Sequence, residues 1–98
     1  MKGKVAVVSG ASSGLGQQMA LAFARQGAKL AILARRVERL TEFEPKLREA
    51  GAADVLAVRC DVTSTEDIDA AAKMVEDKFG RVDILLNCAG SSKDKGVL

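Results

Sequence analysis

The sequence lacks histidine, tryptophan and tyrosine, and only 3% of its 98 residues are aromatic. Without histidine, the two cysteines, Cys60 and Cys88, do not form a metal-ligand spacing, and we predict no metal site. The scarcity of aromatic residues also means that Val, Ile, Leu and Ala have to build the core. That composition is typical of parallel strands covered by helices on both faces.

Long apolar runs and a strong charge of either sign are missing as well. Fifteen basic and thirteen acidic residues leave a net charge of +2, which argues against a nucleic-acid or membrane partner. The first apolar run, residues 5–8, is too short for a signal peptide, and no segment is long enough to span a bilayer. We therefore expect a cytoplasmic protein whose residues 1–98 belong to a single domain.

Short apolar runs alternate with helical patterns along the chain. The apolar runs predict strands at residues 5–8, 30–34, 55–58 and 82–86. The helical patterns predict helices at residues 14–26, 37–50 and 63–79. Thr63 and Glu66 should form a capping box at the start of the third helix. Pro45 should kink the second helix or split it in two.

The spacing of apolar residues also predicts which helix faces are buried. For the first helix the predicted face is Leu15, Met19, Ala22 and Phe23. For the third helix it is Ile68, Ala72, Val75 and Phe79.

This alternation predicts an α/β fold, a Rossmann-type doubly wound parallel sheet. Its first four strands should have the order 3-2-1-4, with three crossover helices. The fourth strand would be left as an open apolar edge, a feature that promotes aggregation, so we expect the N-terminal part of a longer enzyme. Cys60 and Cys88 would lie three strand spacings apart, roughly 14 Å at about 4.8 Å each. They should not form a disulfide, and both should be buried, reduced thiols.

A glycine-rich segment, residues 9–16, joins the first predicted strand to the first predicted helix. Gly10 would allow a tight turn, Gly14 would let the backbone approach a pyrophosphate, and Gly16 would let helix and sheet pack closely. The N–H groups and the positive dipole end at the helix start favour an anion. In this context the segment predicts a phosphate cradle, with an ordinary turn as the alternative. The predicted cradle residues are Gly10, Ser12, Ser13, Gly14, Leu15 and Gly16.

The same segment resembles the Thr-Gly-x-x-x-Gly-x-Gly signature of the short-chain dehydrogenase/reductase superfamily, with Ser9 in the threonine position. Two more motifs follow in the family's order. Asp61-Val62 resembles the Asp-Val after the third strand, where the family's carboxylate meets the adenine amino group. Asp61 could instead be a simple turn or cap residue.

The third motif is Asn87-Cys88-Ala89-Gly90, which resembles the family's Asn-Asn-Ala-Gly after the fourth strand. Cys88 departs from that pattern, and a thiol is a poor hydrogen-bond donor. The resemblance implies that Asn87, Ala89 and Gly90 lie near the adenosine side of the cofactor. A plain strand-ending turn is the alternative.

Alignment with the family also bears on the choice between NADP(H) and NAD(H). Ala34 occupies the position where NAD-preferring folds carry an acidic residue for the ribose 2′-OH. Arg35 and Arg36 follow it, and two guanidinium groups suit a 2′-phosphate. Cations are disfavoured at a helix N-terminus, so an anionic ligand would explain them better than solvent would. We predict NADP(H); Glu38 reaching the ribose would be the route to NAD(H).

The resemblance implies hydride transfer between a nicotinamide and a small-molecule carbonyl or alcohol substrate. The family uses a Tyr-x-x-x-Lys pair for the proton, and this chain contains no tyrosine. No catalytic residue is predicted, and the 98-residue chain alone is expected to be inactive. A non-catalytic NADP-binding module or an inactive fragment remains the alternative. The resemblance also implies a homo-oligomer, a dimer or tetramer, at full length.

Overall fold

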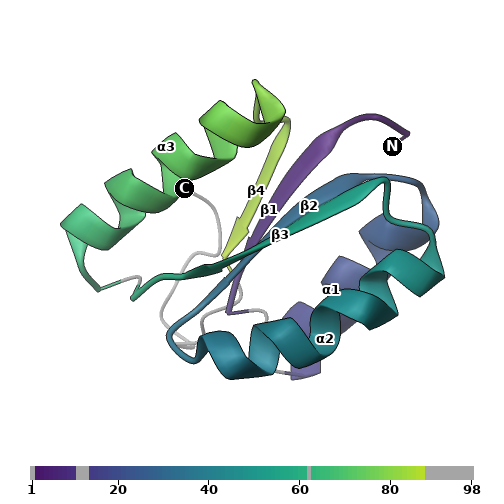
Figure 1. Cartoon of the computed structure of the whole chain (residues 1–98), viewed down its shortest axis with the longest axis horizontal. Helices are drawn as coiled ribbons and strands as arrows, with labels where there is room; N and C mark the ends of the chain where they lie inside the picture. Colours follow the sequence, from purple (N-terminus) through teal and green to yellow (C-terminus); the bar gives the residue numbers. More distant parts are fainter. Residues whose placement is uncertain (1, 11–13, 62, 88–98) are drawn as a thin grey trace.

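The computed structural model describes residues 2–10, 14–61 and 63–87, in which strands and helices alternate (Figure 1). The elements are β1 (Val5–Ser9), α1 (Gly14–Arg25), β2 (Lys29–Ala34), α2 (Val37–Ala50), β3 (Asp54–Arg59), α3 (Thr65–Phe79) and β4 (Ile84–Asn87). Every predicted strand and helix is present. The ends differ from the predicted ones by one or two residues, as is usual for element boundaries.

The four strands form one parallel sheet in the order β3-β2-β1-β4, which confirms the predicted topology. In this register Ser9 at the end of β1 pairs with Leu33 of β2 on one side and Asn87 of β4 on the other. The carboxyl ends of these strands therefore lie level at one edge of the sheet.

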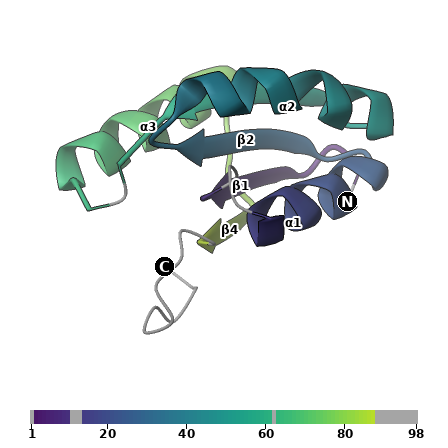
Figure 2. The same cartoon turned by 90° about the horizontal axis from the view of Figure 1, so that it is seen from below.

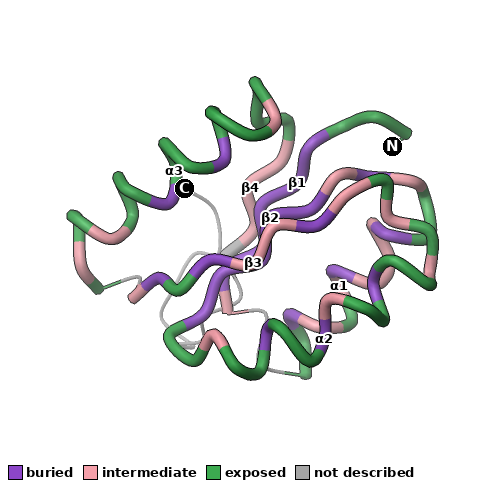
Figure 3. Tube along the Cα trace, in the orientation of Figure 1, coloured by how far each residue is buried: buried purple, intermediate pink, exposed green. Residues whose placement is uncertain are grey.

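Helices lie on both faces of the sheet, with α1 and α2 on one face and α3 on the other (Figure 1). Figure 2 shows the same elements from below. Successive side chains of β1 point to opposite faces of the sheet. Ala6 and Val8 belong to the core under α1 and α2, whereas Val5 and Val7 belong to the core under α3. Burial is concentrated in the strands, as Figure 3 shows. Two-sided burial explains why the strands are continuous apolar runs instead of alternating polar and apolar positions.

The predicted buried face of α1 is mostly wrong, although Phe23 is partly buried and packs against the core. Its buried residues are Gly16, Ala20 and Ala24, spaced four apart, while Leu15 is 61% exposed. Small side chains on this line let the helix axis come close to the sheet. A pattern based on large apolar residues misses such a face, because the residues that make the close contact contribute little hydrophobicity.

The predicted face of α3 is only partly right, and its predicted cap is wrong. Ala71 and Val75 are buried, whereas Ile68 and Ala72 are exposed. The N-cap is Ser64, whose hydroxyl accepts from the backbone N–H of Asp67 at 3.2 Å. A hydroxyl side chain thus caps α3 as predicted, but it belongs to Ser64 and not to Thr63, one residue earlier.

Pro45 does not split the second helix. α2 runs without interruption from Val37 to Ala50, and Leu40, Phe43 and Leu47 are buried against the sheet. Pro45 itself is exposed. The loss of one helical hydrogen bond at an exposed proline is offset by packing on the opposite side of the helix.

Candidate functional site

The strand order β3-β2-β1-β4 gives the sheet a switch point between β1 and β4, where the chain changes direction across the sheet. From β1 the chain crosses through α1 to β2 on one side, and β4 reaches the other side of β1 after α3 has passed over the opposite face. In open α/β sheets, ligands bind outside the carboxyl ends of the strands at such a switch point. The described residues of the predicted site lie at these carboxyl ends. They come after β1, β2 and β3, or, in the case of Asn87, form the last residue of β4.

Gly10 follows the end of β1 and Gly14 begins α1, which are the places where the sequence predicted a phosphate cradle. Gly10 has φ +70°, a conformation that side chains other than glycine rarely adopt, and it turns the chain off the buried strand. Gly14 has no positive φ, and a Cβ placed on it would meet no described atom within 4 Å. Neither backbone conformation nor packing within the described chain therefore requires glycine at position 14.

Leu15 and Gly16 complete the described part of the predicted cradle. Leu15 projects from the first turn of α1 and is largely exposed, whereas Gly16 is buried. Ser12 and Ser13 lie outside the described residues.

Arg35 and Arg36 lie where the sequence placed them, between the end of β2 and the start of α2. Both are exposed, and Arg36 is the N-cap of α2 but makes no side-chain capping bond. Within residues 2–10, 14–61 and 63–87, no carboxylate forms an ion pair with either guanidinium. Two cations thus occupy the positive end of a helix dipole without an ion-paired carboxylate in the described chain.

Asp61 follows β3 and takes part in a turn. Its Oδ1 accepts from the backbone N–H of Thr63 at 2.9 Å and from the Thr63 hydroxyl at 2.7 Å. These two bonds, helped by the charges of Arg35 and Arg59, hold the pKa of Asp61 below its ordinary value. The carboxyl group is therefore ionised at neutral pH, and Arg35 is close enough to affect it.

A backbone bond fixes the spacing between these two parts of the site. The N–H of Cys60 donates to the carbonyl of Ala34 at 2.9 Å, which ties the residue before Asp61 to the residue before Arg35. The structure thus brings Arg35 and Asp61 to one corner of the carboxyl edge. Val62, Ala89 and Gly90 lie outside the described residues, and for Asn87 only the backbone is described, as the last residue of β4.

Sequence reasoning missed the residues that hold the strand ends in place. Ser9 is 2% exposed, and its hydroxyl donates to the carbonyl of Leu86 and joins the ends of β1 and β4. Thr63 and Asp67 anchor Asp61. The signal available for Thr63 was an Asp-x-Thr sequence, in which an Asp side chain commonly bonds the backbone two residues on.

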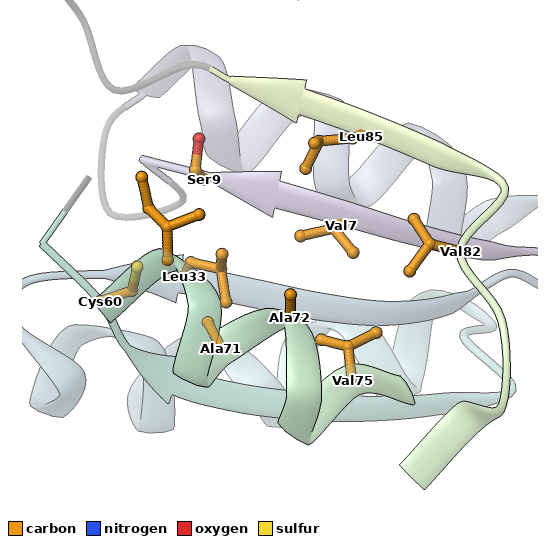
Figure 4. A pocket seen from close by; sticks show the side chains of 10 residues that line it. Val7, Ser9, Leu33, Cys60, Ala71, Ala72, Val75, Val82 and Leu85 are labelled. Carbon is orange, nitrogen blue, oxygen red and sulfur yellow. The ribbon is translucent and has the colours of Figure 1, made fainter. Parts of the chain in front are cut away.

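An apolar groove of about 140 Å³ separates α3 from β1 and β4 (Figure 4). It starts near Ser9 and Cys60 and runs along the sheet face, away from the glycine turn. Its lining residues are Val7, Ser9, Leu33, Cys60, Ile68, Ala71, Ala72, Val75, Val82 and Leu85. Cys60 is a free, buried thiol whose pKa is raised by burial and by Asp67 and Asp61. Cys88 lies outside the described residues.

In residues 2–10, 14–61 and 63–87, no three Cys, Asp or Glu side chains group as metal ligands would. Across the same ranges, none of the helices has the length and apolar character that crossing a bilayer requires.

Comparison with known proteins identifies the family. The fold is that of a doubly wound α/β protein with a glycine turn at its switch point, and the family model for short chain dehydrogenases matches residues 4–98. The chain belongs to the short-chain dehydrogenase/reductase family, which confirms the resemblance seen in its motifs. A farnesol dehydrogenase of Aedes aegypti is 46% identical over 96 residues, which are 98% of this chain and 39% of that protein.

Solved structures of the family agree. L-sorbose reductase from Gluconobacter frateurii, crystallised with NADPH and L-sorbose, matches with a TM-score of 0.88 and 42% identity, over 97% of this chain and 36% of that one. An NAD+-bound xylitol dehydrogenase matches with a TM-score of 0.81 and 36% identity, over 86% and 32% of the two chains. The chain thus spans roughly a third to two fifths of the length of these relatives.

Proposed function

We propose that this chain is the cofactor-binding part of an NADP(H)-dependent oxidoreductase that interconverts a carbonyl and an alcohol on a small-molecule substrate. The proposal rests on the family, on the glycine turn at the switch point and on the two arginines beside it. The bound nicotinamide would supply or accept the hydride, while the residues of this chain bind and orient the nucleotide.

Gly14 is the observation that carries the proposal. It has an ordinary φ, and the space that its Cβ would fill contains no described protein atom. A ligand that approaches the backbone here accounts for a glycine that the fold does not need. The N–H groups in the first turn of α1 and the positive end of the helix dipole would then hold a diphosphate.

Arg35 and Arg36 support the preference for NADP(H). Guanidinium groups suit a phosphate because each offers several donors in a planar fork. The sorbose reductase was solved with NADPH, whereas the xylitol dehydrogenase was solved with NAD+, so the family accommodates both. In this chain Ala34 ends β2 where an acidic residue would favour NAD.

The chemical step needs groups that this chain does not carry. A proton donor or acceptor is required at the substrate oxygen, and the sequence has no tyrosine for that role. We propose that the 98-residue chain binds nucleotide without catalysing hydride transfer and that the rest of a longer protein supplies the catalytic and substrate-binding residues. A cytoplasmic location and a dimeric or tetrameric assembly remain predictions.

Replacement of Gly14 tests the cradle directly. Calorimetric titration of wild type and Gly14→Ala with NADPH and NADH should show that the variant binds both nucleotides about 5- to 100-fold more weakly, because an intruding methyl group in a tight contact costs about 1–3 kcal/mol. The thermal unfolding midpoint should not fall, since Cβ meets no described atom and alanine is a better helix former than glycine.

Gly80→Ala is the matched control with the opposite expectation. Gly80 has φ +79°, lies at the C-cap of α3 and also has open space at its Cβ. This variant should lose about 1–2 kcal/mol of stability from the left-handed backbone and bind nucleotide normally. A Gly14→Ala protein that binds NADPH as tightly as wild type would remove the phosphate assignment.

A further inference from the structure

The backbone of Asp61 is held from the first turn of α3, and we propose that Asp67 is a positioning residue for the carboxylate of Asp61. This inference rests on the proposed function, because it concerns the adenine end of the same nucleotide. It assigns a role to a residue outside the glycine turn, the strand ends and the arginine pair.

The peptide groups on both sides of the Asp61 Cα are fixed. Asp67 Oδ2 accepts from the backbone N–H of Asp61 at 3.0 Å, and the carbonyl of Asp61 accepts from the N–H of Ser64 at 2.9 Å. Any rotation of the Asp61 backbone would break at least one of these bonds. The bond to Asp67 is to a carboxylate, which makes it one of the stronger kinds of hydrogen bond.

The side chain of Asp61 is fixed through one of its two oxygens. Thr63 donates to Oδ1 through both its N–H and its hydroxyl. Oδ2 has no hydrogen-bond partner among the described residues, although a carboxylate oxygen can accept two bonds. The turn therefore presents one carboxylate oxygen in a defined direction, as recognition of an amino group requires.

Asp67 is itself held in place. Its N–H donates to the Ser64 hydroxyl at 3.2 Å as part of the α3 cap, and its Oδ2 lies 3.7 Å from Nη1 of Arg59, the last residue of β3. Asp67 thus joins the end of β3 to the first turn of α3. Through the Cys60–Ala34 bond, the same frame extends to the residue before Arg35.

This arrangement predicts two separable kinds of selectivity. Asp61 would accept from the 6-amino group of adenine, so it should discriminate against hypoxanthine, which carries an acceptor oxygen at that position. The arginines would contact only the 2′-phosphate, so they should discriminate NADPH from NADH. Loss of Asp67 should therefore weaken the first selectivity and leave the second unchanged.

The test is calorimetric titration of the protein that carries this chain with NADPH, NADH and reduced nicotinamide hypoxanthine dinucleotide phosphate. Wild type should prefer NADPH over the hypoxanthine analogue by about tenfold or more, the effect of one hydrogen bond to a charged group. Asp61→Ala should abolish this preference. Asp67→Ala should reduce it to about twofold while the NADPH-to-NADH ratio stays as in wild type.

Two further variants separate positioning from a general structural role. Asp67→Asn keeps an oxygen that can accept from the Asp61 N–H, so it should retain most of the preference for adenine. Asp69→Asn removes an exposed carboxylate from the same helix and should change neither ratio. Each ratio compares ligands on the same folded molecules, so a loss of stability would not mimic the expected result.

Failure of this inference differs from failure of the proposed function. If Asp61→Ala loses the preference for adenine and Asp67→Ala keeps it, Asp67 has no positioning role. If wild type binds NADPH and the hypoxanthine analogue equally, Asp61 does not recognise adenine, and the role of Asp67 is overturned with it. A wild-type protein that binds neither NADPH nor NADH would overturn the proposed function itself.

Discussion

The two faces of the sheet are completed to different degrees. On one face α1 packs on β1 and β2, and α2 packs on β2 and β3, so that Leu30, Ile32 and Leu47 are fully buried. On the other face α3 packs on β2 and β3, and the apolar groove lies open over β1 and β4. The first core is closed by the described helices, whereas the second is covered by α3 on one side only.

This difference shows why hydrophobic pattern and burial disagree on the α3 face. Ile68 lines the groove but is exposed, as are Ala72 and Val82. Ile68 and Ala72 have the periodicity of a buried helix face, and in the described chain nothing packs against them from the far side of the groove. The carboxyl ends of the strands are positioned independently of this gap, because their level ends are set by the register of the sheet.

The largest expected effect comes from a matched pair of leucines on β2. Leu30 points to the closed face and is 0% exposed, and Leu33 points to the groove and is 6% exposed. Leu30→Ala should lower the free energy of unfolding by about 3–5 kcal/mol, because the removed atoms leave an enclosed cavity. Leu33→Ala should cost about 2 kcal/mol, close to the transfer of three carbons alone.

Urea denaturation of the 98-residue chain measures both values. The two residues are of the same type and share a strand, so strand propensity cancels between them. Equal losses at the two positions would mean that the groove is as tightly closed as the other core.

The helices on the two faces also begin differently. α3 starts with the Ser64 side-chain cap, whereas α2 starts at Arg36 without one. Arg36→Ser should therefore raise stability, by about 1 kcal/mol, because serine can cap the free N–H groups and a cation is removed from the positive helix end. The same change should weaken NADPH about tenfold or more while NADH binding changes less than about twofold.

Arg25→Ala is the matched control, since it removes an exposed arginine at the opposite end of α1. It should leave the NADPH-to-NADH ratio as in wild type. Equal weakening of NADPH and NADH by Arg36→Ser would exclude a contact between Arg36 and the 2′-phosphate. A loss of stability would show that Arg36 supports the fold and is not kept for a ligand.

The fold was predictable because its main features follow from local rules. Apolar runs alternating with helical patterns leave few topologies once crossovers are right-handed and parallel. The buried face of α1 was not predictable from the same pattern, because Gly16, Ala20 and Ala24 are small. That Pro45 leaves α2 unsplit was not predictable either, because its effect depends on which side of the helix faces solvent, and only packing decides that.

The candidate site divides in the same way. Gly10, Gly14, Arg35 and Asp61 could be placed together because residues that follow parallel strands reach one edge of the sheet. The bond from the Asp61 N–H to Asp67 could not be predicted, since it depends on where the start of α3 lies relative to the end of β3. Pairings between a side chain and a distant backbone group require the three-dimensional arrangement.

The smallest expected effect is at the seam between β1 and β4. Ahead of the first paired residues, the N–H of Asp83 donates to the carbonyl of Val5, and Asp83 Oδ2 accepts from the Val5 N–H at 2.8 Å. The Val5 N–H thus bonds the Asp83 carboxylate, where a strand would normally offer a backbone carbonyl, just before β1 and β4 begin to pair. The bond from Val5, followed by the one from Arg81, lowers the pKa of Asp83 from its ordinary value of 3.8.

The sign of the pH effect follows from that direction. A carboxyl group whose pKa is lower in the folded chain adds stability above its unfolded pKa, near pH 4, and loses that stability as the pH falls through the folded value. Asp83→Asn keeps an acceptor oxygen without a titrating group. The thermal unfolding midpoint of this variant should therefore fall less steeply than that of wild type between pH 4 and pH 2. Asp69→Asn is the control, and its midpoint should follow the wild-type curve. Parallel curves for wild type and Asp83→Asn would show that this carboxylate does not stabilise the seam, and the amino ends of β1 and β4 would then depend on the backbone bond from Asp83 to Val5.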